Sequence, residues 1–420
     1  MSVGKSLYRL ACSRLEERQL RYCVLREPAD WATPRVEVDL LVDPDDLGGL
    51  RRALGSLGFV EVPAWGRSPH RFFVAYDVNS QSWLKLDVVT AIAFGAPSHA
   101  LRTSLGRACL LRRRREEGIS RPRTEDELVA LALHAIVDKR NFTSERQQRL
   151  AELCHQVSDA AYLDSLLYEW WPGMTAKELA RLVETGNWQD LLAQQPAVER
   201  HLFRRSPVAT TLRRMRDPLL RKLERVWSLL RPRTLAVAIL APDGAGKSTL
   251  IAALDNSFHC SVHAVYMGLY GGKAKAFESR VPGKALLSRL LTQWRRYFDA
   301  RLHQARGRFV FFDRYSYDAL LPPMVPKRGA RLRRWLLAGT CPAPDLVVLL
   351  DAPGKVLFER KHEHTAAALE HQRAGYLSLQ SRLPQMVVVD ATRDAADVCR
   401  DVTSLVWNKY ADRLRSGSAT

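Results

Sequence analysis

The segment "LAPDGAGKSTL", residues 240–250, has the residue types and spacing of a loop that binds phosphate groups. Gly244 and Gly246 let the backbone bend so that successive N–H groups face phosphate oxygens, and a helix after the loop adds its positive N-terminal end. In the pattern G-x-x-x-x-G-K-[ST], Lys247 would reach the β- and γ-phosphates and the hydroxyl of Ser248 would bind Mg²⁺. The segment therefore predicts a nucleotide site.

The flanks of this loop support that interpretation. The apolar run at 235–240 predicts a strand and the segment 248–257 predicts a helix, in the order that the pattern requires. Ala241 stands where the pattern has its first glycine, which narrows the allowed backbone geometry without removing a hydrogen-bond donor. The competing interpretation is a tight glycine-rich turn that happens to end in Lys-Ser, and the two flanks favour the nucleotide site.

A second group with chemical potential is Asp313, Arg314 and Tyr315, directly after the apolar run "RFVFF". If that run is a buried strand, a carboxylate and a guanidinium emerge together at the C-terminal edge of a sheet, where α/β folds bind ligands. A guanidinium suits an anionic group because it can donate two parallel hydrogen bonds. A structural ion pair at a strand end is the alternative.

Three carboxylates in the first half form a third group. Glu37 and Asp39 alternate on the predicted strand 36–42, so both side chains lie on one face, and Asp87 on a second predicted strand could join them. Clustered carboxylates are costly without a cation, which makes the group a candidate Mg²⁺ site. An amphipathic edge strand with its acidic residues in solvent is equally compatible with the pattern.

The elements that must position these groups fall into blocks. Strands and helices mix in the first block, helices dominate the second, and in the last block five short apolar strands alternate with helices, as a parallel sheet covered on both faces requires. Between them lies a basic stretch interrupted by Pro207, Pro218 and Pro232. We therefore expect four parts, with bounds 1–122, 123–203, 204–233 and 234–420.

Residues 234–412 resemble the thymidylate kinase family of P-loop nucleotide kinases. The resemblance rests on the Asp-x-x-Gly-Lys-Ser loop at 243–248, the Asp-Arg-Tyr motif at 313–315 and the "PDL…LD.P…ER" segment at 344–360. It implies an α/β P-loop kinase fold with a parallel five-stranded sheet and helices on both faces. It also implies ATP and Mg²⁺ as cofactors.

The resemblance further assigns roles to single residues. Lys247 and Ser248 would hold ATP and Mg²⁺, Asp243 would contact the acceptor, Asp313 would sit near Mg²⁺ and the attacked phosphate, and Arg314 would grip the anionic acceptor. Arginines or lysines of a helical lid would reach the transferring phosphate, although a solvated basic helix face explains them equally well. The predicted ATP-binding residues, lid included, are Gly244, Ala245, Gly246, Lys247, Ser248, Thr249, Arg360, Lys361 and Arg373.

The acceptor side departs from that family. Where the family carries an Arg-Glu-Pro-Gly-like segment, this chain has "YMGLYGGKAKAFESR" at 266–280. Phosphoryl transfer depends on positioning and charge neutralisation, so the ATP half can persist while the acceptor changes. We therefore expect a kinase for a nucleotide or another small anionic acceptor, not restricted to thymidylate.

Residues 36–59 together with "WLKLDVV" resemble the nucleotidyltransferase fold, which implies an α+β domain, followed by a helical segment. The resemblance implies that Glu37, Asp39 and Asp87 hold a second Mg²⁺. This chain departs from that pattern, because Glu37 replaces the usual first Asp and the expected Gly-Ser turn is absent. A fold that has kept binding but lost catalysis is a further alternative. Three helical residues could line the site: His134, Asp138 and Lys139.

Composition narrows the classes of partner. The chain of 420 residues has a net charge of +19, which favours anionic partners, yet it shows no DNA-binding signature. Its apolar runs are too short to span a bilayer and its seven cysteines form no metal or disulfide pattern, so we expect a cytoplasmic protein with reduced thiols.

The basic stretch 204–233 is amphipathic. It could lie on an anionic membrane, although packing against a domain is the favoured interpretation. The expected partner is a small-molecule acceptor, with no specific nucleic acid, and a homodimer remains open. Two other functions also remain open: a nucleotidyltransferase with a regulatory P-loop domain, and a non-catalytic ATP-binding regulator or scaffold.

Overall fold

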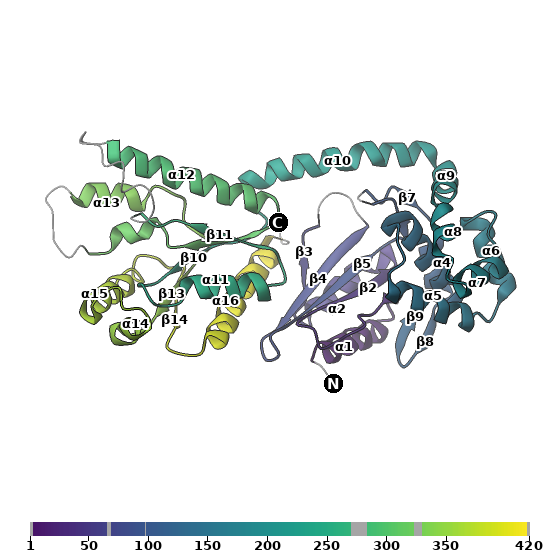
Figure 1. The fold of residues 1–420 in the computed structure, drawn as a ribbon, viewed down its shortest axis with the longest axis horizontal. Helices are drawn as coiled ribbons and strands as arrows, with labels where there is room; N and C mark the ends of the chain where they lie inside the picture. Colours follow the sequence, from purple (N-terminus) through teal and green to yellow (C-terminus); the bar gives the residue numbers. More distant parts are fainter. Residues whose placement is uncertain (1–2, 65–68, 97, 270–283, 323–329, 418–420) are drawn as a thin grey trace. The chain divides into compact units, whose positions relative to one another are not determined.

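The chain forms two compact units, Met1–Glu224 and Arg225–Thr420, shown in Figure 1. The computed structural model describes residues 3–64, 69–96, 98–269, 284–322 and 330–417. The finer division into four parts at 122, 203 and 233 stays a prediction.

The first unit contains a mixed five-stranded sheet in the order β1-β2-β5-β4-β3. Its central strands β2 and β5 are parallel, while the outer pairs are antiparallel. Val36, Val38 and Leu40 alternate along β2 toward a core that α1 and α2 also line. The bounds are β1 Tyr22–Arg26, β2 Arg35–Val42, β3 Val60–Val62, β4 His70–Asp77, β5 Ser82–Val89, α1 Val3–Glu17, η1 Pro44–Asp46 and α2 Leu47–Gly55.

Helices make up most of the rest of this unit. Their largest core cluster includes Leu128, Leu163 and Trp170, and it also takes in Cys23 and Leu41 from the sheet, so sheet and helices share one core. The bounds are β6 Ala93–Phe94, β7 Leu101–Arg102, α3 Leu105–Leu111, β8 Arg114–Glu116, β9 Ile119–Arg121, α4 Thr124–Leu133, the π-helix η2 His134–Lys139, α5 Ser144–Gln156, α6 Ala160–Trp170, α7 Ala176–Glu184, α8 Trp188–Ala193 and α9 Gln195–Arg205.

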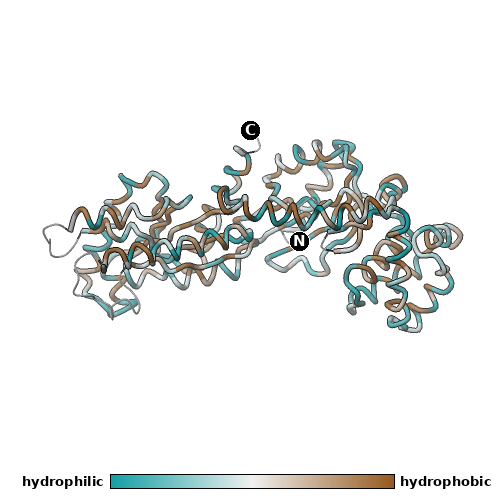
Figure 2. The backbone as a smooth tube through the Cα atoms, turned by 90° about the horizontal axis from the view of Figure 1, so that it is seen from above, coloured by the Kyte–Doolittle hydropathy of each residue, from teal (hydrophilic) through white to brown (hydrophobic). Residues whose placement is uncertain are grey.

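The predicted linker is a single helix, α10, spanning Pro207–Leu230. The expectation that Pro218 breaks it is wrong: the helix continues through Pro218, which only removes the N–H that would bond one turn back. The favoured packing of its apolar side is also wrong. Polar Thr210, Asp217 and Ser228 are its buried side chains. The apolar side chains are exposed instead, and Figure 2 shows hydrophilic and hydrophobic positions alternating along the helix.

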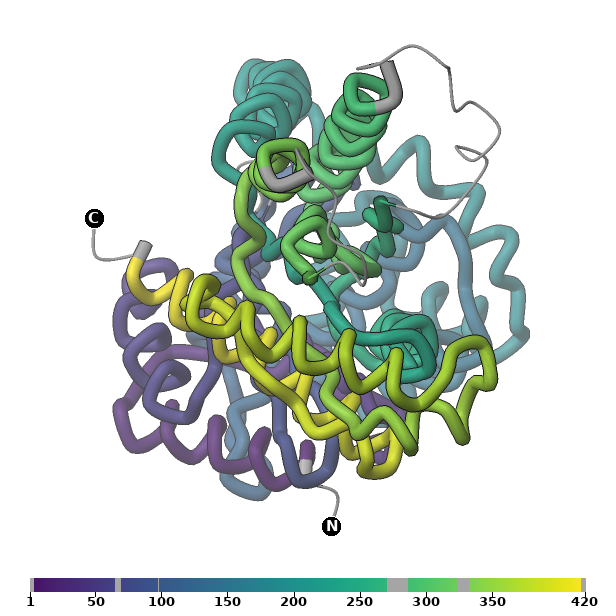
Figure 3. The backbone as a smooth tube through the Cα atoms, turned by 90° about the vertical axis from the view of Figure 1, so that its left-hand side faces the viewer, coloured from purple at the N-terminus to yellow at the C-terminus, as the bar shows by residue number. Residues whose placement is uncertain are grey.

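The second unit is built on a five-stranded sheet in the order β11-β12-β10-β13-β14, and every neighbouring pair is parallel. Helix α12 covers one face of β11 and β12, and α11 and α16 lie on the other side of the sheet (Figures 1 and 3). The strands are β10 Ala236–Leu240, β11 Val262–Tyr266, β12 Phe309–Asp313, β13 Leu346–Asp351 and β14 Met386–Asp390. The predicted α/β fold with a parallel five-stranded sheet is confirmed.

Burial explains why the sequences of the central strands β10 and β12 are continuous apolar runs. All five residues of β10 are buried, and so are the first four of β12, because helices cover both faces. The helices are α11 Lys247–Ser257, α12 Lys284–Ala305, η4 Ser316–Leu320, α13 Ala330–Ala338, α14 Gly354–Arg360, α15 Ala366–Leu377 and α16 Ala395–Gly417.

Candidate functional site

The glycine loop joins the C-terminal end of β10 to the start of α11. Gly244 and Gly246 have φ angles of +89° and +87°, a conformation that favours glycine. A Cβ on Gly244 would lie 2.8 Å from the carbonyl oxygen of Leu357 and 3.4 Å from the Cβ of Lys361, so α14 requires a glycine there as well. A Cβ on Gly246 would meet no described atom within 4 Å, which leaves open space beside the loop.

Lys247 lies beneath this loop. Its Nζ donates to the carbonyl oxygens of Ala241 and Pro242, at 3.0 and 2.9 Å, and only 8% of its side chain is exposed. Burial, reinforced by the positive charge of Arg314, lowers its pKa to about 8. A phosphate bound next to the Lys247 ammonium would favour the charged form and raise the pKa again. Such a response is expected of a lysine that binds an anion.

Arg314 connects the loop to the strand edge. Its guanidinium pairs with Asp243 of the loop and, at 3.4 Å, with Asp318. Burial disfavours the charged guanidinium, but the negative charges of Asp318 and Asp243 outweigh burial and raise its pKa. The backbone of Arg314 has φ +67°, which costs energy for a residue with a side chain and which the ion pairs hold in place. The structure thus brings into contact Asp243 and Arg314, which the sequence singled out separately.

Asp318 and Tyr376 complete this network and were not identified from the sequence. The hydroxyl of Tyr376 donates to Asp318 Oδ1 at 2.9 Å. Burial raises the pKa of the Asp318 carboxyl, although Arg314 beside it acts in the opposite direction. Asp318 follows Arg314 by four residues, which is a weak local signal, whereas Tyr376 is 58 residues away from Asp318 and gives no such signal.

Asp313 and Ser248 are the predicted Mg²⁺ ligands of the loop. Asp313 Oδ1 is buried and has no hydrogen-bond partner among the described residues. A buried oxygen without a partner calls for an explanation, and a hard cation that prefers oxygen ligands supplies one. Ser248 is the second residue of α11 and is exposed. The donor set thus fits Mg²⁺.

The predicted lid residues lie in different surroundings. Arg373 forms a bidentate pair with Asp351, at 2.7 and 3.0 Å, and Arg360 donates to the carbonyl oxygen of Ala391 at 2.8 Å. The Cβ of Lys361 lies beside Gly244, while its Nζ pairs with Glu363 at 3.1 Å. His364, which the sequence did not single out, places its Nε2 3.7 Å from Asp243. The structure thus brings the imidazole of His364, but not the ammonium of Lys361, to the charged side chain of the loop.

The acceptor segment 266–280 is described only in part, because residues 270–283 lie outside the described ranges. At its start, Arg296 of α12 donates to the carbonyl oxygen of Gly268 at 3.0 Å, and Gln293 donates to that of Met267 at 3.1 Å. Helix α12 therefore holds the chain where it leaves β11.

In the first unit, the parallel register of β2 and β5 brings the three predicted carboxylates together. Asp39 is the direct partner of Asp87, and Glu37 is the partner of Lys85. One oxygen of each carboxylate lies within 4.8 Å of the others. The predicted clustering is therefore seen in the structure, while metal binding there stays a prediction.

Each of these carboxylates also has a basic side chain beside it, Lys85, Arg26 or His70, that sequence reasoning missed. Lys85 lies 2.9 Å from Glu37, and Arg26 lies 2.9 Å from Asp39. Burial raises the pKa of Asp39 despite Arg26, and the other two carboxylates add to the rise. The third pair joins the Nδ1 of His70 to Asp87 at 2.7 Å.

These side chains line a cavity of about 1910 Å³ within the first unit. The π-helix η2 contributes to its wall, where His134 pairs with Asp138 at 3.0 Å and Lys139 follows. Asp138 also accepts the backbone N–H of Gly95 at 2.7 Å, which fixes its carboxylate. The three helical residues named from the sequence thus line the same cavity as the carboxylate cluster.

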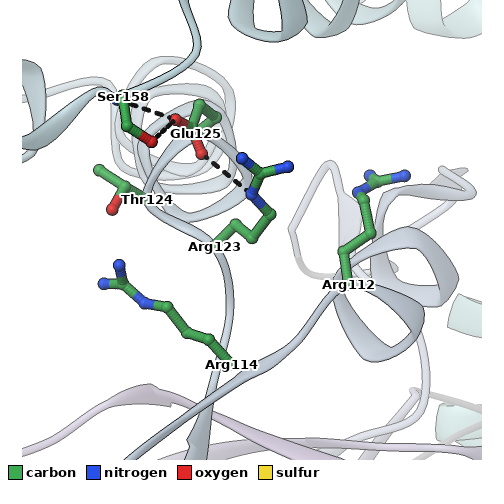
Figure 4. Close-up of a pocket in the computed structure, with 6 residues that line it drawn as sticks. All are labelled: Arg112, Arg114, Arg123, Thr124, Glu125 and Ser158. Atoms are coloured by element: carbon green, nitrogen blue, oxygen red, sulfur yellow. Dashed lines mark hydrogen bonds and ion pairs between the residues drawn. The ribbon is translucent and has the colours of Figure 1, made fainter.

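A smaller pocket of about 460 Å³ in the same unit gathers arginines, as Figure 4 shows. Arg112 pairs with Asp126 at 2.9 Å, and Arg123 approaches the buried Glu125 at 3.5 Å. Glu125 in turn accepts the N–H of Ser158 at 3.1 Å. These contacts give Arg112, Arg123 and Glu125 partners within the fold itself.

No helix within the described ranges combines the length and the apolar character needed to cross a bilayer.

The relatives compared below with this chain are all named thymidylate kinases or probable thymidylate kinases. No protein-family model matches the chain. The thymidylate kinase of Xanthomonas campestris pv. campestris (strain B100) is 33% identical over 211 residues, which covers 45% of this chain and 90% of that protein. The thymidylate kinase of Xanthomonas oryzae pv. oryzae (strain PXO99A) is 31% identical over 212 residues, with the same coverage of 45% and 90%.

More distant matches have the same name. A probable thymidylate kinase of Thermococcus onnurineus is 32% identical over 117 residues, or 26% of this chain and 56% of that protein. Among solved structures, the thymidylate kinase of Candida albicans matches 42% of this chain and 93% of its own, with 17% sequence identity and a TM-score of 0.35.

Proposed function

This chain belongs to the thymidylate kinase family, and we propose that its second unit transfers the γ-phosphoryl group of ATP, with Mg²⁺, to a nucleotide or another small anionic acceptor. The observation that carries the proposal is the convergence of three side chains at one end of the parallel sheet. Lys247 lies under the glycine loop, and Asp243 lies within it. Arg314, which follows β12, the strand adjacent to β10 in the sheet, pairs with Asp243.

Each of these side chains has a defined task in the proposal. The backbone N–H groups of the loop and the N-terminus of α11 bind the phosphates of ATP. Lys247 exchanges its carbonyl partners for phosphate oxygens and neutralises their charge. Arg314 presents its planar guanidinium to the acceptor anion, with Asp243 and Asp318 fixing its orientation.

Ser248 and Asp313 would hold Mg²⁺ at this site. When bound, the cation supplies charge neutralisation for the transferring phosphoryl group. The unpartnered oxygen of Asp313 supports this assignment. The assigned roles of Thr249, Ala245, Arg360 and Arg373 in ATP binding are part of the same proposal, and for Arg373 the proposal requires that its pair with Asp351 opens.

The acceptor need not be thymidylate. The segment that departs from the family begins at Tyr266, so the acceptor pocket differs while the ATP half is kept. The test is to supply labelled ATP with a panel of nucleoside monophosphates, nucleosides and phosphosugars. We expect transfer to at least one, abolished by Lys247→Met. ATP binding without transfer to any acceptor would favour an ATP-binding regulator or scaffold instead.

A second candidate function belongs to the first unit. Glu37, Asp39 and Asp87 meet in the large cavity, and this cluster supports a nucleotidyltransferase-like α+β domain with its own Mg²⁺. In that alternative, the first unit transfers a nucleotide and the P-loop unit regulates it. Pyrophosphate release lost in Asp39→Asn but kept in Lys247→Met would support this alternative, and the reverse pattern would reject it.

We also propose that α10 contacts anionic lipid. Leu212, Leu219, Leu223 and Trp227 are 61%, 58%, 56% and 59% exposed, and they follow one another at helical spacing. Such side chains can enter the boundary between headgroups and acyl chains, while neighbouring arginines pair with lipid phosphates. The arginines and lysine of α10 are Arg213, Arg214, Arg216, Arg221, Lys222 and Arg225.

A further inference from the structure

The smaller pocket of the first unit, with a volume of about 460 Å³, lies at the start of α4 and is called the α4 pocket below. Figure 4 shows the side chains that line it: Arg112, Arg114, Arg123, Thr124, Glu125 and Ser158. Helix α4 has ten residues, and Arg123, which precedes it, makes no side-chain hydrogen bond that caps it. Because the first N–H groups of a helix lack an intrahelical acceptor, the start of α4 offers this pocket donors and the positive end of the helix dipole.

Thr124 adds a buried polar group that has no partner. It is the first residue of α4 and is only 3% exposed. Its hydroxyl nevertheless forms no hydrogen bond with any residue that the structure describes, although it lines the pocket. Buried polar groups normally have a partner, so this hydroxyl calls for an explanation. A ligand oxygen in the α4 pocket supplies one, because a hydroxyl can donate to it.

Arg114 is a second group with unused donors. Its Nε is buried and forms no hydrogen bond with a described residue, although an oxygen of Glu116 lies 3.0 Å away. Its two terminal nitrogens also have no acceptor among the described residues, and Figure 4 shows the guanidinium pointing toward Thr124. A guanidinium can donate two parallel hydrogen bonds to a phosphate group, which makes Arg114 suited to an anion of that shape.

The carboxylates at the start of α4 are compensated by partners of their own. The side chain of Glu125 is 1% exposed and accepts the N–H groups of Ser158 and Asp159, each at 3.1 Å. Asp126 has a fully buried side chain and pairs with Arg112 at 2.9 Å. A buried charge with such partners acts weakly on a neighbouring ligand, so the charge left without a hydrogen bond at this pocket is that of a guanidinium.

We propose that the α4 pocket binds the phosphoryl group of a small phosphorylated molecule, with Arg114, Thr124 and the N-terminus of α4 as the donors. The N-terminus of a helix together with a guanidinium is an arrangement that favours phosphate. Arg114 and Thr124 also line the cavity of about 1910 Å³, so the rest of such a molecule has room beside the pocket. Free phosphate has the same anionic chemistry and would occupy the pocket alone.

Hydrogen exchange measured by mass spectrometry on the full chain tests this site locally, because a bound anion slows exchange of the first N–H groups of α4. The probes are inorganic phosphate and glucose 6-phosphate, with KCl at matched ionic strength. We expect both phosphate compounds to slow exchange in peptides covering residues 122–128 several-fold. A lower half-saturating concentration of glucose 6-phosphate would identify an esterified phosphate as the ligand, and the reverse order would identify free phosphate. Equal slowing by KCl would overturn the proposal.

Variants of the two side chains with unused donors complete the test. Arg114→Gln and Thr124→Val should each raise the half-saturating concentration several-fold, whereas Thr124→Ser keeps the hydroxyl and should keep binding. The matched control is Arg115→Gln, which removes one charge from the next residue of β8, a side chain that is 65% exposed and outside the pocket lining. It should bind like the unchanged protein.

The glycine loop of the second unit also binds phosphate in the proposed function, so Lys247→Met separates the two sites. This variant should keep the slowing at residues 122–128, and the proposal for the α4 pocket therefore stands or falls independently of kinase activity. Absence of slowing there in the unchanged protein, or equal slowing in Arg114→Gln/Thr124→Val, would overturn the proposal.

Discussion

Arg314 and Asp243 form an ion pair between the end of β12 and the glycine loop, although 71 residues separate them in sequence. The pair is possible because β10 and β12 are adjacent and parallel, so both chains leave the sheet at the same edge. It fixes the loop to the residue proposed to bind the acceptor. In the proposed mechanism, binding of ATP and binding of the acceptor therefore share one electrostatic contact.

Replacing Arg314 tests this contact. Arg314→Lys keeps the positive charge but loses the planar fork that meets Asp243 and Asp318, so we expect kcat/KM for the acceptor to fall by about 10²–10³-fold. Steady-state assays against both substrates measure the effect. Arg382→Lys, at an exposed position of the same unit, serves as control and should change nothing. An equal loss in both variants would contradict the role of Arg314.

Lys247 predicts a pH dependence of nucleotide binding. Its pKa of about 8 lies below the ordinary 10.5, so the free protein loses this charge as the pH rises through 8. ATP requires the charged form, and we expect proton uptake on binding at pH 8.5 and an affinity that falls about tenfold per pH unit above 8. Calorimetry in buffers of different ionisation enthalpy measures the uptake. Lys247→Met should abolish it.

The same shift makes a prediction about stability. Between about pH 8 and 10.5 the unfolded chain retains the Lys247 proton while the folded chain has released it. The unfolded state then binds more protons, so the contribution of this residue to the free energy of unfolding rises with pH across that window. Urea unfolding of the unchanged protein and Lys247→Met at pH 7 and 9.5 compares the two slopes, and parallel slopes would contradict the shift.

Tyr376→Phe tests the buried support of Arg314. The substitution removes the hydroxyl that donates to Asp318, leaving that buried carboxylate with Arg314 alone. We expect a loss of about 1–2 kcal/mol in the free energy of unfolding of this unit. The same substitution at Tyr168, which is 81% exposed, should have no effect. A larger KM for the acceptor in Tyr376→Phe would further indicate that Arg314 is oriented through Asp318.

The burial of Asp39 leads us to expect that a divalent cation stabilises the first unit. Burial raises its carboxyl pKa, so its contribution to stability falls as the pH rises above the ordinary value of 3.8 and the buried carboxylate loses its proton. A divalent cation would offset that cost. We expect Mn²⁺ or Mg²⁺ to raise the unfolding temperature of the unchanged protein but not of Asp39→Asn. Asp77→Asn, at the last residue of β4 and outside the carboxylate cluster, is the control. An equal metal response in both variants would argue against the site.

Lipid binding by α10 can be measured with vesicles. We expect the protein to sediment with vesicles rich in phosphatidylserine and less with neutral vesicles, and binding to weaken as salt rises. Leu219→Asp/Leu223→Asp should remove binding because both side chains are exposed and the fold does not require them. Arg204→Ala/Arg205→Ala on α9 lowers the net charge by the same two units as the two Leu→Asp changes, but outside α10. Equal binding by both variants would show that only net charge matters.

Much of the second unit followed from the sequence alone. The glycine loop, the apolar strands and the position of Asp313 and Arg314 after a strand depend on local chain order, and five parallel strands with intervening helices allow few arrangements. The α10 helix shows the limit of such reasoning. The amphipathic spacing of α10 could be recognised in the sequence. Which side of the helix is buried, however, depends on neighbours such as the carbonyl oxygen of Ala100, to which Arg213 donates a hydrogen bond.

By itself, the sequence determined the type of fold of the second unit and which residues enter the loop, because periodicity and spacing along the chain encode both. Only the tertiary structure decided which side chains meet. Tyr376 reaches Asp318, and His263 reaches Asp299 and His303, across long stretches of chain. Such contacts depend on strand order and helix packing, which bring distant residues within a few ångströms without leaving any local pattern.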